Sequence, residues 1–222
     1  MFINIKDARK HYGEGETLVN ALDGVSLSLN EGRIYVILGP SGSGKSTLLN
    51  MIGGLDSLDS GEIMIADRNI SGSDKKKLID YRREDVGFVF QFYNLIPDLT
   101  VQENIEVVSD ISKNPLDIEE VMTALDIEKY RNRFPKELSG GQQQRAAIAR
   151  ALIKNPKILL CDELTGALDS KSSRSVLKFI EKINEQFKTT IIIITHNEAI
   201  ADMADSVIRI KDGRIADYTE NS

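Results

Sequence analysis

Residues 39–46 of this 222-residue chain read Gly39-Pro40-Ser41-Gly42-Ser43-Gly44-Lys45-Ser46 and follow directly on the apolar run Ile34–Leu38. The next residues, up to Ile52, have the pattern of a helix, so the sequence predicts a strand, a glycine-rich loop and a helix in succession. Glycines let consecutive backbone N–H groups converge on an anion, and the start of the helix adds its partial positive charge. In this context the pattern G-x-x-x-x-G-K-[ST] predicts a nucleoside triphosphate site.

The side chains of this loop have distinct expected roles. Lys45 can reach the β- and γ-phosphates, and the Ser46 hydroxyl can ligate Mg²⁺. A glycine-rich turn that binds nothing is the alternative, but the strand and the helix on either side favour the phosphate site. The residues expected to contact the nucleotide here are Gly39, Pro40, Ser41, Gly42, Ser43, Gly44, Lys45, Ser46 and Thr47.

The rest of the chain predicts an α/β fold. The apolar runs Ile158–Cys161 and Thr189–Ile194 are typical of buried strands, and a helix of about residues 172–185 between them indicates a parallel sheet. Residues before 34 alternate apolar and polar side chains, which predicts antiparallel strands. Residues of about 94–154 are helical in pattern. We therefore expect one domain over residues 1–222: a P-loop NTPase core with a mainly parallel sheet, an N-terminal antiparallel β subdomain and an inserted helical subdomain at about 94–154.

Composition excludes several classes of protein. Hydrophobic residues make up 41% and charged residues 28%, which suits a packed domain rather than a disordered chain. The net charge of −6 argues against general affinity for nucleic acid. The single cysteine, Cys161, fits a reducing compartment, and no secretion signal or membrane-spanning run is visible. These features predict a cytoplasmic chain with no nucleic-acid partner.

Two further segments carry chemistry. Asp162 and Glu163 close an apolar strand at the end where open α/β sheets bind ligands, so Asp162 is expected to hold Mg²⁺ and Glu163 to act as general base. Two acidic residues that only mark a strand end are the alternative, which the phosphate loop disfavours. Leu138-Ser139-Gly140-Gly141-Gln142 precedes a helical pattern and offers a second anion site at a helix start, with a plain helix cap as its alternative.

Taken in order, these motifs resemble the ATP-binding domain of ABC transporters over essentially the whole chain. The resemblance rests on residues 39–46, Gln91, the signature 138–142, Asp162-Glu163, Ala167-Leu168-Asp169 and His196. Within the family it is nearest to the branch of macrolide-export, lipoprotein-release and peptide-antibiotic-resistance ATPases. Where that family usually has proline after the two acidic residues this chain has Leu164, which is expected to loosen the loop slightly without loss of activity.

The resemblance implies further site residues. Gln91 corresponds to the glutamine that contacts Mg²⁺ and the attacking water, and His196 to the histidine that bonds the γ-phosphate. Tyr12 corresponds to the aromatic residue that stacks on adenine, with an ordinary tyrosine as the alternative. In the family, two domains close on two ATP molecules, so Ser139, Gly140, Gly141 and Gln142 would contact ATP held by the partner, and Asp169 would link the two sites.

The resemblance also implies the function. We expect an ATPase that forms a homodimer when ATP and Mg²⁺ are bound and powers export or membrane extraction through an integral-membrane permease subunit. Such a chain would lie on the inner face of the cell membrane, and its permease would contact the groove near residues 91–99. A regulatory or cell-division ATPase that uses ATP only as a clamp is the alternative. The cargo cannot be read from this sequence, because the membrane partner recognises it.

Overall fold

The computed structural model describes residues 1–166 and 168–221, and the chain forms two compact units. The first unit comprises Met1–Arg82 and Ile192–Ser222, and the second comprises Arg83–Ile191. The chain passes back from the second unit to the first within β8 (Thr190–Thr195). Each unit has its own core of aliphatic side chains.

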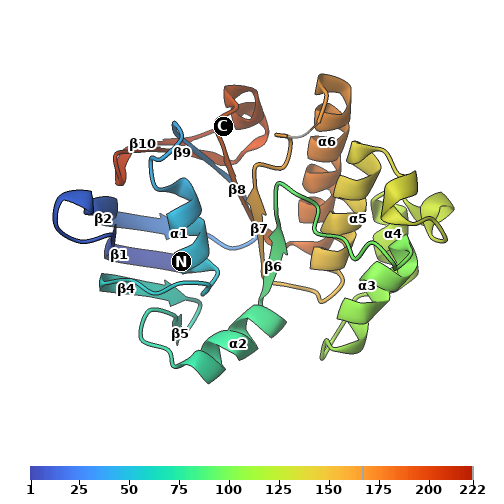
Figure 1. The fold of residues 1–222 in the computed structure, drawn as a ribbon, viewed down its shortest axis with the longest axis horizontal. Helices are drawn as coiled ribbons and strands as arrows, with labels where there is room; N and C mark the ends of the chain where they lie inside the picture. The colour runs from blue at the N-terminus through green and yellow to red at the C-terminus, as the bar shows by residue number, and fades with distance from the viewer. Residues whose placement is uncertain (167, 222) are drawn as a thin grey trace. The chain divides into compact units, whose positions relative to one another are not determined.

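An antiparallel sheet of four strands in the order β2-β1-β4-β5 forms one part of the first unit (Figure 1). The strands are β1 (Ile3–Tyr12), β2 (Val19–Leu29), β4 (Ser60–Ile65) and β5 (Arg68–Asn69). Ile3 lies opposite Leu29 on one side and Ile65 on the other. Because Ile3, Ile5 and Ala8 are buried while intervening residues are not, the alternation in the sequence places one face of this sheet in the core. The predicted antiparallel N-terminal part is confirmed.

The phosphate loop belongs to the other part of the first unit. There β3 (Ile34–Leu38) is buried along its whole length and lies between β8 and β9 (Ser206–Lys211), and β10 (Arg214–Glu220) pairs antiparallel with β9. Val36 lies opposite Val207 in the parallel pairing of β3 with β9. Helix α1 (Lys45–Ile52) follows the loop, α2 (Lys75–Glu84) begins in this unit, and the short helices η1 (Gly15–Thr17) and η4 (Glu198–Met203) lie in its loops.

The second unit is mainly helical. Strand β6 (Val86–Val89) pairs in parallel with β7 (Ile158–Asp162), with Val86 opposite Ile158. Its helices are α3 (Val101–Asp110), α4 (Ile118–Ala124), α5 (Gly140–Leu152) and α6 (Ser170–Phe187), with the short η2 (Glu128–Tyr130) and η3 (Pro135–Glu137) between α4 and α5. Helix α5 packs against α3, α4 and α6 (Figure 1). Its buried residues include four alanines, which permit this close packing: Ala146, Ala147, Ala149 and Ala151.

These elements confirm the predicted α/β class with a mostly parallel sheet, and they confirm that the middle of the chain is helical. The two units meet in sequence at residues 82/83 and 191/192, whereas the sequence placed the helical insert at about 94–154. The organisation as one domain over residues 1–222 stays a prediction. Within residues 1–166 and 168–221, no helix is long and apolar enough to cross a membrane.

Candidate functional site

The loop between β3 and α1 packs so closely that two of its positions admit only glycine. Gly44 precedes α1 with φ +102, and a Cβ there would lie 2.2 Å from the carbonyl oxygen of Ala21. A Cβ on Gly39 would lie 2.3 Å from the carbonyl oxygen of Ile210. The loop therefore approaches its neighbouring strands so closely that a side chain would displace it, and backbone N–H groups are left to face a ligand.

Lys45 is almost fully buried in this loop, with 7% of its surface exposed. Its Nζ donates hydrogen bonds to the carbonyl oxygens of Gly39 and Pro40, each at 2.8 Å. The Ser43 hydroxyl is buried and has no hydrogen-bond partner within the residues that the structure describes. A buried hydroxyl and a buried ammonium in one glycine-rich loop at a helix start favour an anion as the missing partner.

Tyr12 lies at the end of β1, in the same unit as the phosphate loop. The residue is 43% exposed, and its hydroxyl donates a 2.9 Å hydrogen bond to Oδ2 of Asp56. Burial raises the pKa of the Tyr12 hydroxyl, the Asp56 carboxylate raises it further, and a hydrogen bond with Thr47 of α1 lowers it in part. The Tyr12 hydroxyl is therefore held by Asp56, a residue beyond the C-terminal end of α1.

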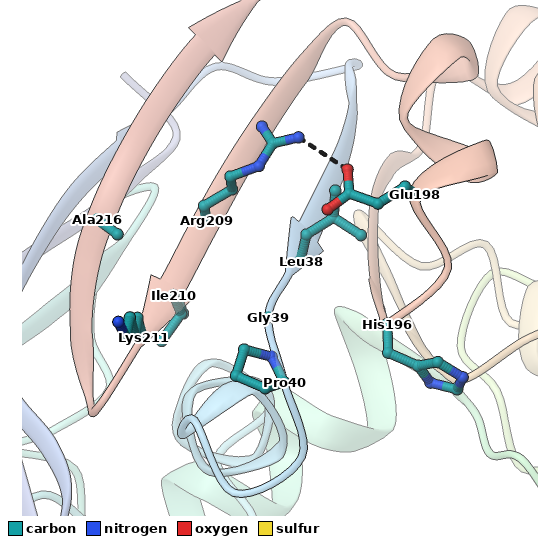
Figure 2. A pocket seen from close by; sticks show the side chains of 9 residues that line it. All are labelled: Leu38, Gly39, Pro40, His196, Glu198, Arg209, Ile210, Lys211 and Ala216. Carbon is teal, nitrogen blue, oxygen red and sulfur yellow. Dashed lines mark hydrogen bonds and ion pairs between the residues drawn. The ribbon is translucent and has the colours of Figure 1, made fainter.

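His196 follows β8 and is exposed. Together with Gly39 and Pro40 it lines a cavity of about 320 Å³ (Figure 2). Two residues beyond His196, Glu198 accepts a 2.8 Å hydrogen bond from Arg209 of β9, drawn as the dashed line in Figure 2. The structure thus brings His196 to the start of the phosphate loop and fixes the segment after it to a strand.

The acidic pair lies in the second unit at the end of β7. Asp162 is the last residue of the strand, and Glu163 adopts the left-handed conformation with φ +49, which is strained for a residue with a side chain. Gln91 follows β6, the strand parallel to β7, and a Cβ on Gly166 would lie 3.2 Å from Gln91 Nε2. Gln91 and the segment after Glu163 are therefore neighbours at the carboxyl ends of two adjacent strands.

The residues beside the acidic pair have structural roles. Cys161 is fully buried, and burial raises the pKa of its thiol far above the ordinary value, as expected for a small apolar side chain rather than a nucleophile. Leu164 is 1% exposed and packs in the core. Ala167 lies outside the described residues.

The signature segment forms the start of α5. Ser139 precedes the helix and is exposed, and its backbone N–H donates a 2.8 Å hydrogen bond to Oε1 of Gln142. A Cβ on Gly140 would lie 2.9 Å from the Tyr93 hydroxyl, and one on Gly141 would lie 3.3 Å from Cβ of Ser172. Close packing therefore requires small residues at this helix start, where backbone N–H groups remain available to an anion.

Asp169 receives a local role that the sequence did not suggest. Its carboxylate accepts hydrogen bonds from the backbone N–H of Ser172 at 3.0 Å and from the Ser172 hydroxyl at 2.6 Å. These contacts satisfy donors in the first turn of α6. The side chain is exposed, so a capping role leaves it accessible to other contacts.

Sequence reasoning missed the residues that support these side chains. Asp56 and Lys10 hold Tyr12, and Arg209 holds the segment after His196. The resemblance pointed to Tyr12 but indicated no contact for Lys10 or Asp56. A contact across 44 positions, such as that of Tyr12 with Asp56, leaves no local signal in the sequence.

Comparisons with known proteins agree with these motifs. The sequence model of the ABC transporter family matches residues 22–166 of this chain. A protein of Mycoplasma pneumoniae, named as an ABC transporter ATP-binding protein, is 44% identical over 220 residues, which cover 97% of this chain and 65% of that protein. The macrolide export ATP-binding/permease protein MacB of Shigella flexneri is 41% identical over 218 residues, which cover 96% of this chain and 34% of MacB. The chain thus spans about two thirds of the length of the Mycoplasma protein and about one third of the length of MacB.

One solved structure resembles the chain along nearly its whole length. It is a dimeric, post-hydrolysis state of the ATP-binding cassette MJ0796, a protein of Methanocaldococcus jannaschii, bound to ADP and Pi. The two chains superpose with a TM-score of 0.87 at 39% sequence identity, and the match covers 98% of each. That cassette has therefore been seen as a dimer with the products of ATP hydrolysis.

Proposed function

The chain is an ATP-binding domain of the ABC transporter family, and on that premise we propose that it hydrolyses ATP to power a transporter whose membrane-spanning part is a separate partner. The observation that carries the proposal is the phosphate loop, in which Lys45 and the Ser43 hydroxyl are buried at the start of α1. Two further observations support it: Tyr12 and His196 belong to the same unit as that loop, and His196 lines a cavity with Gly39 and Pro40. The proposal assigns the adenine base to Tyr12, the phosphates to the loop and the γ-phosphate to His196.

In this proposal the loop residues 39–47 bind the phosphates of ATP. The ammonium of Lys45 exchanges its two carbonyl hydrogen bonds for phosphate oxygens, which are stronger acceptors because they are charged. The Tyr12 ring stacks on adenine, and the His196 imidazole hydrogen-bonds the γ-phosphate. Stacking on a ring does not read the edges of a base, so Tyr12 alone gives little preference for ATP over GTP.

The donors proposed for Mg²⁺ fit that ion. They are the Ser46 hydroxyl, the Gln91 amide oxygen and the Asp162 carboxylate, all oxygen ligands of the kind that Mg²⁺ prefers. When bound, the ion neutralises negative charge on the phosphates. Ser46 and Gln91 are exposed and Asp162 is half-buried at the end of β7, so each side chain is accessible to a ligand.

Hydrolysis in this proposal depends on Glu163 as general base. Its carboxylate takes a proton from the attacking water, and Gln91 orients that water through its neutral amide. The strained conformation of Glu163 supports the assignment, because such strain is concentrated at functional sites. Lys45 and His196 then stabilise the charge that develops on the γ-phosphate.

We further propose that two copies of the chain close on two ATP molecules. The start of α5, with the exposed Ser139 and the half-buried Gly140, Gly141 and Gln142, contacts the γ-phosphate held by the other copy, and Asp169 links the two sites. Support comes from the helix start, which retains free N–H groups, and from the dimeric state of the similar cassette. The dimer opens when the phosphate is released, which couples the reaction to movement.

The partner proposed for this dimer is an integral-membrane permease subunit that contacts residues 91–99. Phe92 is 74% exposed and Ile96 is 40% exposed, so apolar side chains are available there. Binding to such a subunit would hold the chain on the inner face of the cell membrane. Similarity to a macrolide exporter favours export or membrane extraction over the alternative of a clamp that never transports.

The test compares the purified chain with Glu163→Gln. We expect phosphate release to fall at least about a hundredfold, because a general base of this kind contributes that much or more. The variant should still bind ATP and should accumulate as a dimer on size-exclusion chromatography in Mg-ATP. Glu181→Gln, an exposed residue on α6, is the matched control and should keep wild-type turnover.

Two outcomes would contradict the proposal. Wild-type turnover in Glu163→Gln would remove Glu163 from the chemistry. A wild-type chain that dimerises in ATP but never releases phosphate, even with its membrane partner, would favour the clamp.

A further inference from the structure

A small polar cluster, the Tyr12 cluster of Lys10, Tyr12 and Asp56, lies at the end of β1. The Asp56 carboxylate accepts the Tyr12 hydroxyl at 2.9 Å through Oδ2 and the Lys10 ammonium at 3.3 Å through Oδ1. Lys10 also donates a 2.8 Å hydrogen bond to the carbonyl oxygen of Ser57. Lysine is seldom this buried, at 9% exposed, unless its charge is matched, and here Asp56 matches it.

The cluster fixes how the Tyr12 ring stands. The Lys10 Nζ lies over the ring, 5.3 Å from its centroid, within the range of a cation–π contact. Even so, 43% of the surface of Tyr12 is exposed. The hydroxyl is thus held by a carboxylate and the ring lies beside a cation, while enough of the residue is exposed for contact with a flat ligand.

The loop that contains Asp56 is itself fixed to β1. Oδ2 of Asp59 accepts the backbone N–H of His11 at 2.6 Å, and the Asp59 N–H donates to the carbonyl oxygen of Arg9 at 3.0 Å. Because these contacts flank Lys10 on β1, the position of Asp56 relative to Tyr12 is determined by backbone as well as by side chains. The cluster is therefore a built support and not a chance surface ion pair.

We propose that Lys10 and Asp56 are positioning residues that hold the Tyr12 ring ready to stack on the adenine base of ATP. The inference rests on the proposed function in one respect, namely that Tyr12 is the base contact. A tyrosine with a free hydroxyl would lose rotational freedom when a base stacked on it, whereas an anchored ring has already lost that freedom. The support should therefore affect ligands that contain a base and leave phosphate binding unchanged.

The experiment measures the affinity of the full chain for Mg-ATP and, separately, for Mg-tripolyphosphate, which has the phosphates but no base. Asp56→Asn removes the charge of the carboxylate, Lys10→Met removes the ammonium, Tyr12→Phe removes the hydroxyl that donates to Asp56, and Tyr12→Ala removes the ring. We expect each of the first three to weaken ATP binding about threefold to tenfold and tripolyphosphate binding less than about twofold. In the pair Tyr12→Phe with Asp56→Asn, the effects should not add, because Tyr12→Phe removes the hydrogen bond that Asp56→Asn weakens by removing the charge of its acceptor.

Tyr218→Phe is the matched control, since it removes the hydroxyl of a tyrosine on β10 with a similar exposure of 37%. It should leave both affinities unchanged. If Asp56→Asn does not fold, as judged by thermal unfolding, Tyr12→Phe removes the hydrogen bond to Asp56 with less disturbance and decides the question.

The outcomes separate the two claims. If Tyr12→Ala binds ATP as the wild type does, Tyr12 is not the base contact and the proposed function fails in that respect. If Tyr12→Ala weakens ATP binding but Tyr12→Phe and Asp56→Asn do not, only the positioning role is wrong. Equal loss of affinity for ATP and tripolyphosphate would also overturn it, because the cluster would then support the phosphate loop and not the base.

Discussion

At the scale of single residues, Gly44 and Glu163 are two of the positions that adopt a positive φ, and they do so for different reasons. Gly44 precedes α1 with φ +102, and the carbonyl oxygen of Ala21 occupies the space that a Cβ would need. Glu163 adopts φ +49 although it has a side chain. Steric exclusion explains the glycine, whereas the strain at Glu163 is retained at the position proposed for the general base.

Gly44→Ala should destabilise the chain much more than Gly15→Ala does. Both glycines have a positive φ, +102 and +57, but a Cβ on Gly15 meets no atom within 4 Å. We expect a loss of about 1 kcal/mol for Gly15→Ala from backbone strain alone, and about 3 kcal/mol or more for Gly44→Ala, where a clash is added. Urea unfolding measures both, and equal losses would show that the loop can move away from Ala21.

At the scale of elements, the segment before α3 is held by one buried amide. Asn104 is fully buried, and its Nδ2 donates to the carbonyl oxygens of Ile96, Leu99 and Thr100 at distances of 2.9–3.1 Å. Its Oδ1 accepts the backbone N–H of Ile96 at 2.8 Å. The segment 96–100 is therefore held to α3 by Asn104, although it has no regular structure of its own.

Asn104→Ala should lower the free energy of unfolding by about 2–4 kcal/mol, because several buried backbone groups lose their partner at once. Asn114→Ala, at an exposed asparagine beyond α3, should change it by less than about 0.5 kcal/mol. Chemical denaturation gives both values, and hydrogen exchange should show lost protection at the Ile96 amide. A small effect of Asn104→Ala would mean that water satisfies these groups.

At the scale of the whole molecule, stability should depend on pH through Lys154, a partly buried lysine. Burial lowers the pKa of Lys154 from 10.5 to about 8, and the charge of Asp85 opposes part of that shift. Below pH 8 the amine is charged in both the folded and the unfolded chain. Between pH 8 and 10.5 the unfolded chain holds the proton that the folded chain has released, so Lys154 makes stability rise with pH in this window.

Lys154→Met should remove this rise. The free energy of unfolding of the wild type, relative to that of Lys154→Met, should increase by about 1–3 kcal/mol between pH 7 and pH 10.5. This range follows from the lowered pKa of Lys154, reduced by solvent screening of the amine. The measurement is urea unfolding at a series of pH values, with Lys178→Met, an exposed lysine on α6, as the control for net charge. A constant difference between wild type and Lys154→Met would show that this amine titrates at its ordinary pKa.

Much of the candidate site could be predicted from the sequence because its chemistry depends on local order. The phosphate loop between Leu38 and Lys45, the helix start after Ser139 and the acidic end of β7 each occupy consecutive residues, and the structure shows each in the predicted setting. The roles of Gln91, His196 and Tyr12 came from family resemblance, since a lone side chain has no pattern of its own. Their assignments stay proposals.

The order of residues along this chain was sufficient for its class of fold, its family and its phosphate loop, because hydrophobic periodicity and glycine spacing act over short distances. Contacts between distant positions became visible only in three dimensions. Examples are the contacts of Asp56 with Tyr12, of Arg209 with Glu198 and of Gln91 with Gly166. Such contacts depend on how strands and loops are brought together by burial of the apolar core, and no short segment of sequence contains that information.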